Sequence, residues 1–152
     1  MSAASGSAAA VTAMRPFERS LPMALMRARE AVMTRFRPIL VEHGLTEQQW
    51  RVLRLLDSRD EACSVGEIAE QTFLLGPSLS RMLVSLADRD LIERSPSDGD
   101  ARRVDVSISD AGRRLVAEIG PESEAAYDLI EQRFAPGELD LLHELLDRCC
   151  EG

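Results

Sequence analysis

The chain has 152 residues, of which 45% are hydrophobic and 29% are charged, and its formal net charge at pH 7 is −8. This length and composition predict one globular domain with a real core and exclude two. No apolar run approaches the roughly 18 residues of a membrane span. The opening stretch, MSAASGSAAAVTAM, lacks the cationic and apolar regions of a signal peptide. We therefore expect a disordered tail over residues 1–15 and a cytoplasmic protein with no membrane partner.

The charge is unevenly distributed along the chain. All 18 basic residues are arginine, and residues 1–114 contain 16 Arg and 16 Asp or Glu, whereas residues 115–152 contain 2 Arg and 10 acidic residues. The net negative charge therefore lies in the last quarter. Because electrostatic attraction acts within a Debye length of about 8–10 Å in physiological salt, the acidic total does not exclude a nucleic-acid partner for the middle of the chain.

The spacing of the cysteines and histidines indicates neither a disulfide framework nor a metal site. Cys63, Cys149 and Cys150 have neither disulfide-framework nor zinc-ligand spacing, and His43 and His143 lie far apart in the sequence. There is also no glycine-rich phosphate loop and no nucleophile with a matching base. We expect no cofactor, no metal and no enzymatic activity.

The first predicted helix covers residues 17–41. Its apolar residues recur at steps of three and four, which is typical of one face of an amphipathic helix. Pro38 is expected to kink the end of this helix. The apolar residues of this face are Leu21, Leu25, Ala28, Val32, Phe36 and Ile39.

Capping motifs mark the next two helices. In LTEQQW (45–50), Thr46 and Gln49 form the pattern of a capping box, and Leu45 and Trp50 that of a hydrophobic staple. SVGE (64–67) repeats the capping pattern, with Ser64 as the cap and Glu67 reaching back, and predicts a short helix to about residue 72. The buried positions expected in the second helix are Trp50, Leu53 and Leu56.

A fourth helix is predicted over residues 77–89, beginning at Pro77. Its exposed first turn carries Ser78, Ser80 and Arg81. Two short helices in a tight arrangement, with hydroxyls and a cation at the amino end of the second, are typical of a helix-turn-helix that contacts DNA in the major groove. An ordinary surface helix with a polar first turn is the alternative. The expected buried stripe is Leu79, Met82, Leu83 and Leu86.

A β-hairpin, or wing, is predicted next. LIER (91–94) and VDVSI (104–108) alternate apolar and polar residues, and the nine residues between them predict a long tip. Arg102 and Arg103 are expected at this tip, where they would contact the minor groove or its phosphates. Asp100 is expected to shape the tip by pairing with one guanidinium. A merely solvated hairpin is the alternative.

Two helices complete the chain. Ser109 is expected to cap a helix over residues 110–134 that is interrupted or bent near Gly120 and Pro121, and Pro136 is expected to open a last helix to about Cys150. The predicted fold is therefore mostly α with a small β-hairpin wing. It is a winged helix-turn-helix flanked by N- and C-terminal dimerisation helices.

The segment DARRVDVSISDAG (100–112) resembles the wing of the MarR family of dimeric transcriptional regulators. In that family a D-x-R-R tip precedes alternating strand residues and a T/S-x-x-G helix start. The resemblance extends over about residues 16–150 and departs at Asp90, where the family usually has glycine. It implies a single MarR-type domain over 16–150, with a DNA-binding lobe at 45–112 and dimerisation helices at 16–44 and 113–150. The resemblance also implies a homodimer that binds a palindromic operator in double-stranded DNA.

Residues 25–56 are similar to the branch of the family that represses homoprotocatechuate (4-hydroxyphenylacetate) degradation operons, which implies release by an aromatic carboxylate effector. On the first helix, Arg29, Met33 and Arg37 recur at helical spacing, a surface that could hold an aromatic ring and its carboxylate. We expect Arg29 to anchor the carboxylate, Met33 and Trp50 to contact the ring, and Arg37 and His43 to be secondary contacts. Methionines facing a dimer partner and arginines in surface ion pairs are the alternative.

Dimerisation is expected to bury a set of leucines from both ends of the chain, namely Leu21, Leu25, Leu139, Leu142, Leu145 and Leu146. Three other functions remain to be compared with an aromatic-acid repressor. A MarR-type regulator of another phenolic, stress or efflux response has the same signatures. A winged-helix protein-interaction module would lack salt-dependent DNA binding. A thiol-based oxidant sensor of the family would have a cysteine in the first helix, and this chain has none before Cys63.

Overall fold

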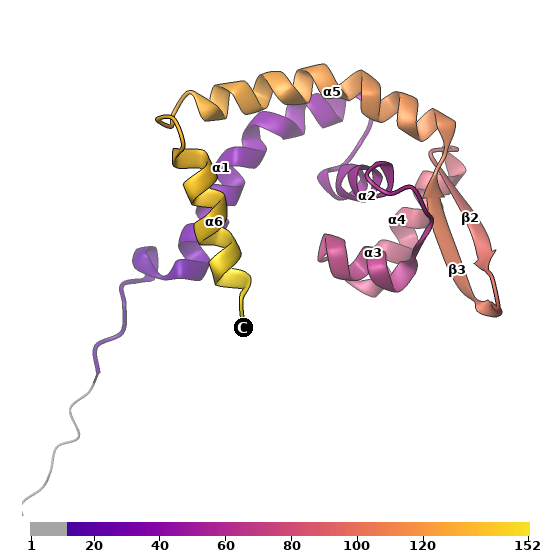
Figure 1. The fold of residues 1–152 in the computed structure, drawn as a ribbon, viewed down its shortest axis with the longest axis horizontal. Coiled ribbons are helices and arrows are strands. Elements are labelled where there is room, and N and C mark those ends of the chain that lie inside the picture. The colour runs from indigo at the N-terminus through magenta and orange to yellow at the C-terminus, as the bar shows by residue number, and fades with distance from the viewer. Residues whose placement is uncertain (1–11) are drawn as a thin grey trace, which may run out of the picture. The chain divides into compact units, whose positions relative to one another are not determined.

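The computed structural model describes residues 12–152, with Ala101 described in its backbone only, so the predicted disorder of residues 1–11 lies outside the described residues. Residues 12–16 have no regular secondary structure. The elements, shown in Figure 1, are η1 (Phe17–Arg19), α1 (Leu21–Glu42), α2 (Glu47–Asp57), β1 (Cys63–Ser64), α3 (Val65–Thr72), α4 (Gly76–Asp88), β2 (Ile92–Ser97), β3 (Asp100–Ile108), α5 (Asp110–Glu131) and α6 (Glu138–Cys150). In this part of the chain, no helix is long and apolar enough to span a membrane.

The chain divides into two compact units, one ending at Met33 and the other comprising Thr34–Gly152, and α1 continues from the first into the second. In the first unit, the apolar side chains expected to form a core stripe are exposed, with Leu21 56% and Leu25 38% accessible. Of the predicted stripe of α1, Phe36 is buried and Ile39 half-buried, both in the second unit. Within a single chain, therefore, only the second half of this stripe packs in the core, and Leu21 and Leu25 are the residues that were expected in the dimer interface. Pro38 lies inside α1, which continues to Glu42.

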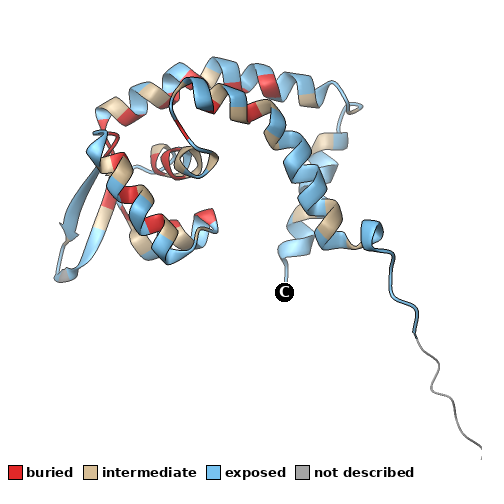
Figure 2. Cartoon of the chain, turned by 180° about the vertical axis from the view of Figure 1, so that it is seen from behind, coloured by how far each residue is buried: buried red, intermediate tan, exposed pale blue. Residues whose placement is uncertain are grey.

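The core of the second unit is formed where α2, α3, α4, the sheet and the first half of α5 meet. Figure 2 shows buried residues along these elements. The predicted positions Leu53 and Leu56 of α2 are buried, whereas Trp50 and Met82 are half-buried and pack against the core. The fully buried side chains of this core include Val52, Leu53, Ile68, Leu79, Leu86, Val106 and Ile119.

The predicted caps position these helices. Thr46 and Gln49 form the complete capping box, with the Gln49 amide donating to Thr46 Oγ1 at 3.1 Å and the Thr46 amide donating to Gln49 Oε1 at 3.0 Å. Ser64 Oγ accepts from the Glu67 amide at 3.1 Å. In the described chain Glu67 does not complete a capping box, so only half of that prediction holds. Ser109 Oγ accepts from the Gly112 amide at 3.0 Å and starts α5.

The sheet has three antiparallel strands in the order β1-β3-β2, with Ile92 opposite Ile108 and Cys63 opposite Val106. Strand β1 was not predicted. The hairpin strands are also longer than expected, so the prediction of a long tip is wrong. The turn between the strands consists of Asp98 and Gly99, and Gly99 has φ +90°.

The base of the hairpin is closely packed. Asp90, which stands where the family usually has glycine, has φ +58°, a left-handed conformation that glycine adopts most readily. A Cβ on Gly112 would clash with the backbone oxygen of Leu91 and lie 2.7 Å from Ile108 Cγ1, so only glycine fits at this place. The same Leu91 oxygen accepts from the Ser109 amide at 3.1 Å. The entry to α5 is thereby fixed against the hairpin.

The two C-terminal helices differ in detail from the prediction. Helix α5 runs without interruption through Gly120 and Pro121 and ends at Glu131. Helix α6 begins at Glu138, two residues after Pro136, with Gly137 as its N-cap. All residues of α6 are described and none is buried. Its leucines are therefore available to another chain.

Candidate nucleic-acid interface

Helix α4 exposes polar side chains in its first two turns, and its opposite face packs in the core. Leu79, Leu83 and Leu86 are buried in the core of the second unit. Ser80 and Arg81 are exposed, and Ser78 is half-buried. The sequence correctly predicts the exposure of Ser80 and Arg81, because the apolar residues recur at three- and four-residue steps and these two fall between them. Ser78 was also expected to be exposed, and it is half-buried. The exposed hydroxyl and guanidinium can reach an external ligand.

The connection from α3 to α4 is held by hydrogen bonds to the end of α3. Arg51 Nη1, from α2, donates to the backbone oxygen of Thr72 at 2.8 Å. The buried Thr72 hydroxyl donates to the Ile68 oxygen at 2.5 Å. Phe73 then adopts φ +58° and ends α3, and α4 begins at Gly76. This tight turn positions the two helices as in a helix-turn-helix.

The two wing arginines lie in a strand. Arg102 and Arg103 are exposed residues of β3, so their predicted place at the tip of the hairpin is wrong. They border a cleft of about 340 Å³ that is also lined by Ser64, Val65, Gly66 and Val104. Because β3 pairs with β1 next to the start of α3, both guanidiniums are carried by a strand that is joined to the helix-turn-helix.

Asp100 shapes the turn in a different way from the one expected. Its Oδ1 accepts a hydrogen bond from the backbone amide of Arg102 at 3.0 Å, whereas the prediction was a pair with a guanidinium. A carboxylate bound to a backbone amide two residues on is a common stabiliser of turns. Asp100 therefore fixes the backbone from which the arginine side chains project.

The five predicted effector residues are divided between the two units. Arg29 and Met33 belong to the first unit, where Arg29 Nη1 lies 3.5 Å from Glu30 Oε1 and Met33 is half-buried. Arg37, His43 and Trp50 belong to the second. Neither unit by itself assembles all five, and the effector pocket stays a prediction.

The three residues in the second unit have defined contacts. Arg37 binds Glu47 through Nη2 at 3.1 Å and Nε at 3.2 Å. His43 Nε2 lies 3.4 Å from a Glu122 carboxylate oxygen. The Arg54 guanidinium carbon lies 5.9 Å from the centroid of the Trp50 ring, within range of a cation–π interaction.

Glu47 was missed by sequence reasoning. Its carboxylate accepts from Arg37 and, at 3.0 Å, from Arg51 Nη2, and its side chain is only 12% accessible. The i,i+4 spacing to Arg51 could have indicated one of these pairs. Arg51 in turn holds Thr72, so a chain of charged hydrogen bonds extends from α1 to the end of α3.

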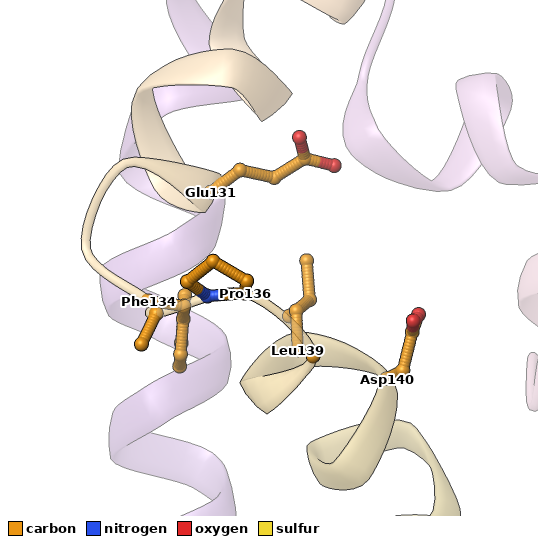
Figure 3. Close-up of a pocket in the computed structure, with 7 residues that line it drawn as sticks. Glu131, Phe134, Pro136, Leu139 and Asp140 are labelled. Atoms are coloured by element: carbon orange, nitrogen blue, oxygen red, sulfur yellow. The ribbon is translucent and has the colours of Figure 1, made fainter.

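Two further clefts lie elsewhere in the second unit. A cavity of about 330 Å³ at the turn between α5 and α6, drawn in Figure 3, has Glu131 on α5 and Asp140 on α6 among its lining residues. These carboxylates would repel an anion. A second cleft of about 280 Å³ includes Cys63. Burial, together with the charge of Glu67, raises the pKa of the Cys63 thiol, which therefore stays protonated at neutral pH.

Comparisons with known proteins place this geometry in a family. Residues 43–103 match the profile of the MarR family. The HTH-type transcriptional regulator FarR of Neisseria gonorrhoeae is 39% identical over 84% of this chain and 86% of its own. The homoprotocatechuate degradative operon repressor of Escherichia coli is 35% identical over the same shares of the two chains.

Solved structures agree with this assignment. The crystal structure of NadR in complex with 4-hydroxyphenylacetate has a TM-score of 0.79 and 35% identity, and the match covers 92% of this chain and 99% of NadR. The relatives are regulators, not enzymes, and their fold matches the six helices and small sheet described above. The chain belongs to the MarR family of DNA-binding transcriptional regulators.

Proposed function

We propose that this protein is a homodimeric repressor that binds a palindromic operator, and that an aromatic carboxylate of the 4-hydroxyphenylacetate type releases it. The regulated operon would encode degradation of such an acid, and the protein would act on DNA in the cytoplasm. The observation that carries this proposal is the 35% identity, over most of the chain, to the homoprotocatechuate operon repressor and to NadR with bound 4-hydroxyphenylacetate.

The arrangement of the second unit supports DNA binding. The first turn of α4 and the exposed arginines of β3 are held by the same core. In this proposal, Ser78, Ser80 and Arg81 contact the major groove. Arg102 and Arg103 contact the minor groove or the phosphates beside it, and Asp100 fixes the turn that precedes them, as described above. Two copies related by a two-fold axis would meet successive major grooves about 34–36 Å apart.

The exposed leucines support the dimer. Leu142 and Leu145 of α6 are 37% and 45% accessible, and Leu21 of α1 is 56% accessible. Such a set of apolar side chains near both chain ends favours an isologous interface that buries them. We propose that the dimerisation helices are those at 16–44 and 113–150 and that 45–112 binds DNA.

The effector would be recognised by a guanidinium and an apolar wall. Arg29, Met33 and Arg37 follow one another at four-residue spacing along the continuous helix α1. We assign the carboxylate to Arg29, the ring to Met33 and Trp50, and secondary polar contacts to Arg37 and His43. Because Arg29 and Arg37 each have a carboxylate within reach, the effector must compete with Glu30 and Glu47. The effector can release the operator only if it binds the DNA-free conformation of the protein more tightly than the DNA-bound conformation.

The test is direct measurement of operator binding and its release. Fluorescence anisotropy with DNA from upstream of the gene should show salt-dependent binding that 4-hydroxyphenylacetate or 3,4-dihydroxyphenylacetate reverses. Arg29→Ala should keep operator binding but need about 10–100-fold more acid, because a charge-assisted hydrogen bond contributes about 1.5–3 kcal/mol.

The matched control is Arg27→Ala. Arg27 lies on the same helix, and its Nη2 donates to the backbone oxygen of Glu18 at 3.1 Å. The Arg27→Ala variant removes the same charge as Arg29→Ala and should leave the affinity for the effector unchanged in calorimetry. Equal affinities of wild type and Arg29→Ala would make Arg29 a surface ion-pair partner. Release by none of the phenolic acids would reject the aromatic-acid part of the proposal, and binding insensitive to salt would reject the DNA-binding part.

A further inference from the structure

The turn that leads into α4 exposes two large apolar side chains. Phe73 is 89% accessible and Leu75 is 77% accessible, whereas Leu74 between them packs against the core. These are the two highest exposures among the large apolar residues described in the second unit. The core holds Leu74, but no residue from 12 to 152 covers its two neighbours.

Leu75 occupies a position where three other helices of the chain have a hydroxyl. It is the N-cap of α4 and forms no side-chain capping hydrogen bond. The N-caps of α2, α3 and α5 are Thr46, Ser64 and Ser109, and each accepts a hydrogen bond from a backbone amide of its helix. Leucine is among the poorest N-cap residues. Its presence here therefore serves neither the helix nor the core, and such local inconsistencies are expected at functional sites.

The place of Leu75 in the fold indicates its partner. It directly precedes the first two turns of α4, which carry Ser78, Ser80 and Arg81. The amino end of this helix is the part that meets base edges in a helix-turn-helix. In the major groove, thymine alone presents an apolar group, its 5-methyl. An exposed leucine continuous with a DNA-binding surface matches that group.

We infer that Leu75 contacts the 5-methyl group of a thymine in each half-site of the operator and so selects sequence at that position. This inference rests on the proposed operator binding. It adds an apolar specificity contact to the polar and cationic contacts assigned above.

The test removes only the methyl group. Each thymine of the footprinted operator is replaced in turn, symmetrically in both half-sites, by deoxyuridine. Burying one methyl contributes about 0.8 kcal/mol. Replacing the contacted thymine by deoxyuridine should therefore lower the affinity of the wild type for its operator about fourfold per half-site and ~15-fold for the pair. We call this loss of affinity the deoxyuridine penalty. Leu75→Ala should bind the thymine operator more weakly and show no further loss with deoxyuridine.

Two further variants separate this contact from folding effects. Val84→Ala removes another exposed apolar side chain of α4, 46% accessible and more than two turns further along, and should keep the full deoxyuridine penalty. Leu75→Ser should improve the helix cap and raise the melting temperature. Its affinity should nevertheless be the same for the thymine and the deoxyuridine operators. A gain in stability with a loss of methyl discrimination cannot come from damage to the fold.

The outcomes are distinct. A penalty present in wild type and Val84→Ala but absent in Leu75→Ala and Leu75→Ser supports the contact. A penalty of equal size in Leu75→Ala overturns it, as does an operator in which no thymine methyl matters to wild type. Failure of wild type to bind any upstream DNA would instead overturn the proposed function. Binding of another protein at Leu75, with normal DNA affinity of Leu75→Ala, would also refute the inference.

Discussion

The wing arginines give the most direct quantitative prediction. Arg102 and Arg103 are exposed on β3, and each is expected to neutralise a phosphate or enter the minor groove. The logarithm of a DNA-binding constant falls with the logarithm of salt concentration by about 0.9 per neutralised phosphate. Because a homodimer loses the contact twice, Arg102→Ala or Arg103→Ala should reduce the slope by about 1.8.

This change is large enough to measure by anisotropy titrations at several salt concentrations. Between about 50 and 200 mM salt, a slope smaller by about 1.8 means that the variant loses ~12-fold less affinity than wild type. Arg113→Ala is the charge-matched control, because Arg113 Nη1 is paired with Asp57 Oδ1 at 3.2 Å at the start of α5. It should keep the wild-type slope. Equal slopes for wild type and both wing variants would refute the assignment of Arg102 and Arg103 to DNA.

The remaining predictions concern folding and assembly. Gly112→Ala should destabilise the protein by about 1–3 kcal/mol in thermal unfolding, because its Cβ would collide with backbone, whereas Gly120→Ala, with open space at its Cβ, should be neutral or stabilising. A melting temperature of Gly112→Ala at or above wild type would contradict the close packing. Phe73→Gly should raise the melting temperature by a few degrees, since it relieves a left-handed bulky residue that is 89% accessible. A lower melting temperature would refute the backbone strain at Phe73. Leu142→Ala with Leu146→Ala should raise the dimer dissociation constant at least tenfold per leucine in sedimentation, because each buried leucine contributes about 1.5–3 kcal/mol; an unchanged dimer would place the interface elsewhere.

The sequence predicts features whose cause is local. The caps at Thr46, Ser64 and Ser109 each depend on one side chain and an amide within three residues, so spacing alone identifies them. The buried leucines of α4 follow from the helical period in the same way. The candidate residues on α4 lie where the sequence places them because the helical period alone decides which side chains of this helix face the core.

Strand lengths depend on pairing and could not be obtained in this way. Strand β2 continues through Pro96, a residue that argues against a strand because it cannot donate to the ladder. It is tolerated because β2 is an edge strand, next to β3 only, and the register shifts between Pro96 and Ser97. The two-residue strand β1 is formed only by pairing with β3. As a result, Arg102 and Arg103 belong to a strand and not to the predicted loop.

Periodicity also indicates burial without identifying the partner. The apolar stripe of α1 is regular along the helix, yet Leu21 and Val32 are 56% and 37% accessible in the single chain. An apolar stripe predicts that something covers it, and the covering surface can belong to another molecule. In this fold, the same argument applies to α6, which buries no residue of its own.

The contact between Arg37 and Glu47 shows why an effector site is harder to predict than a DNA surface. The residues that could bind a carboxylate are arginines, but in the folded chain Arg37 already has one, from a glutamate ten positions later on another helix. Glu47 also binds Arg51, and Arg51 donates to the Thr72 oxygen at the end of α3. An anion that replaces Glu47 as the partner of Arg37 therefore changes the charge balance of a series of contacts that ends at the helix-turn-helix. The effector's affinity is therefore set by the difference between two carboxylates competing for one guanidinium, and that difference depends on tertiary contacts that no spacing along the sequence reveals.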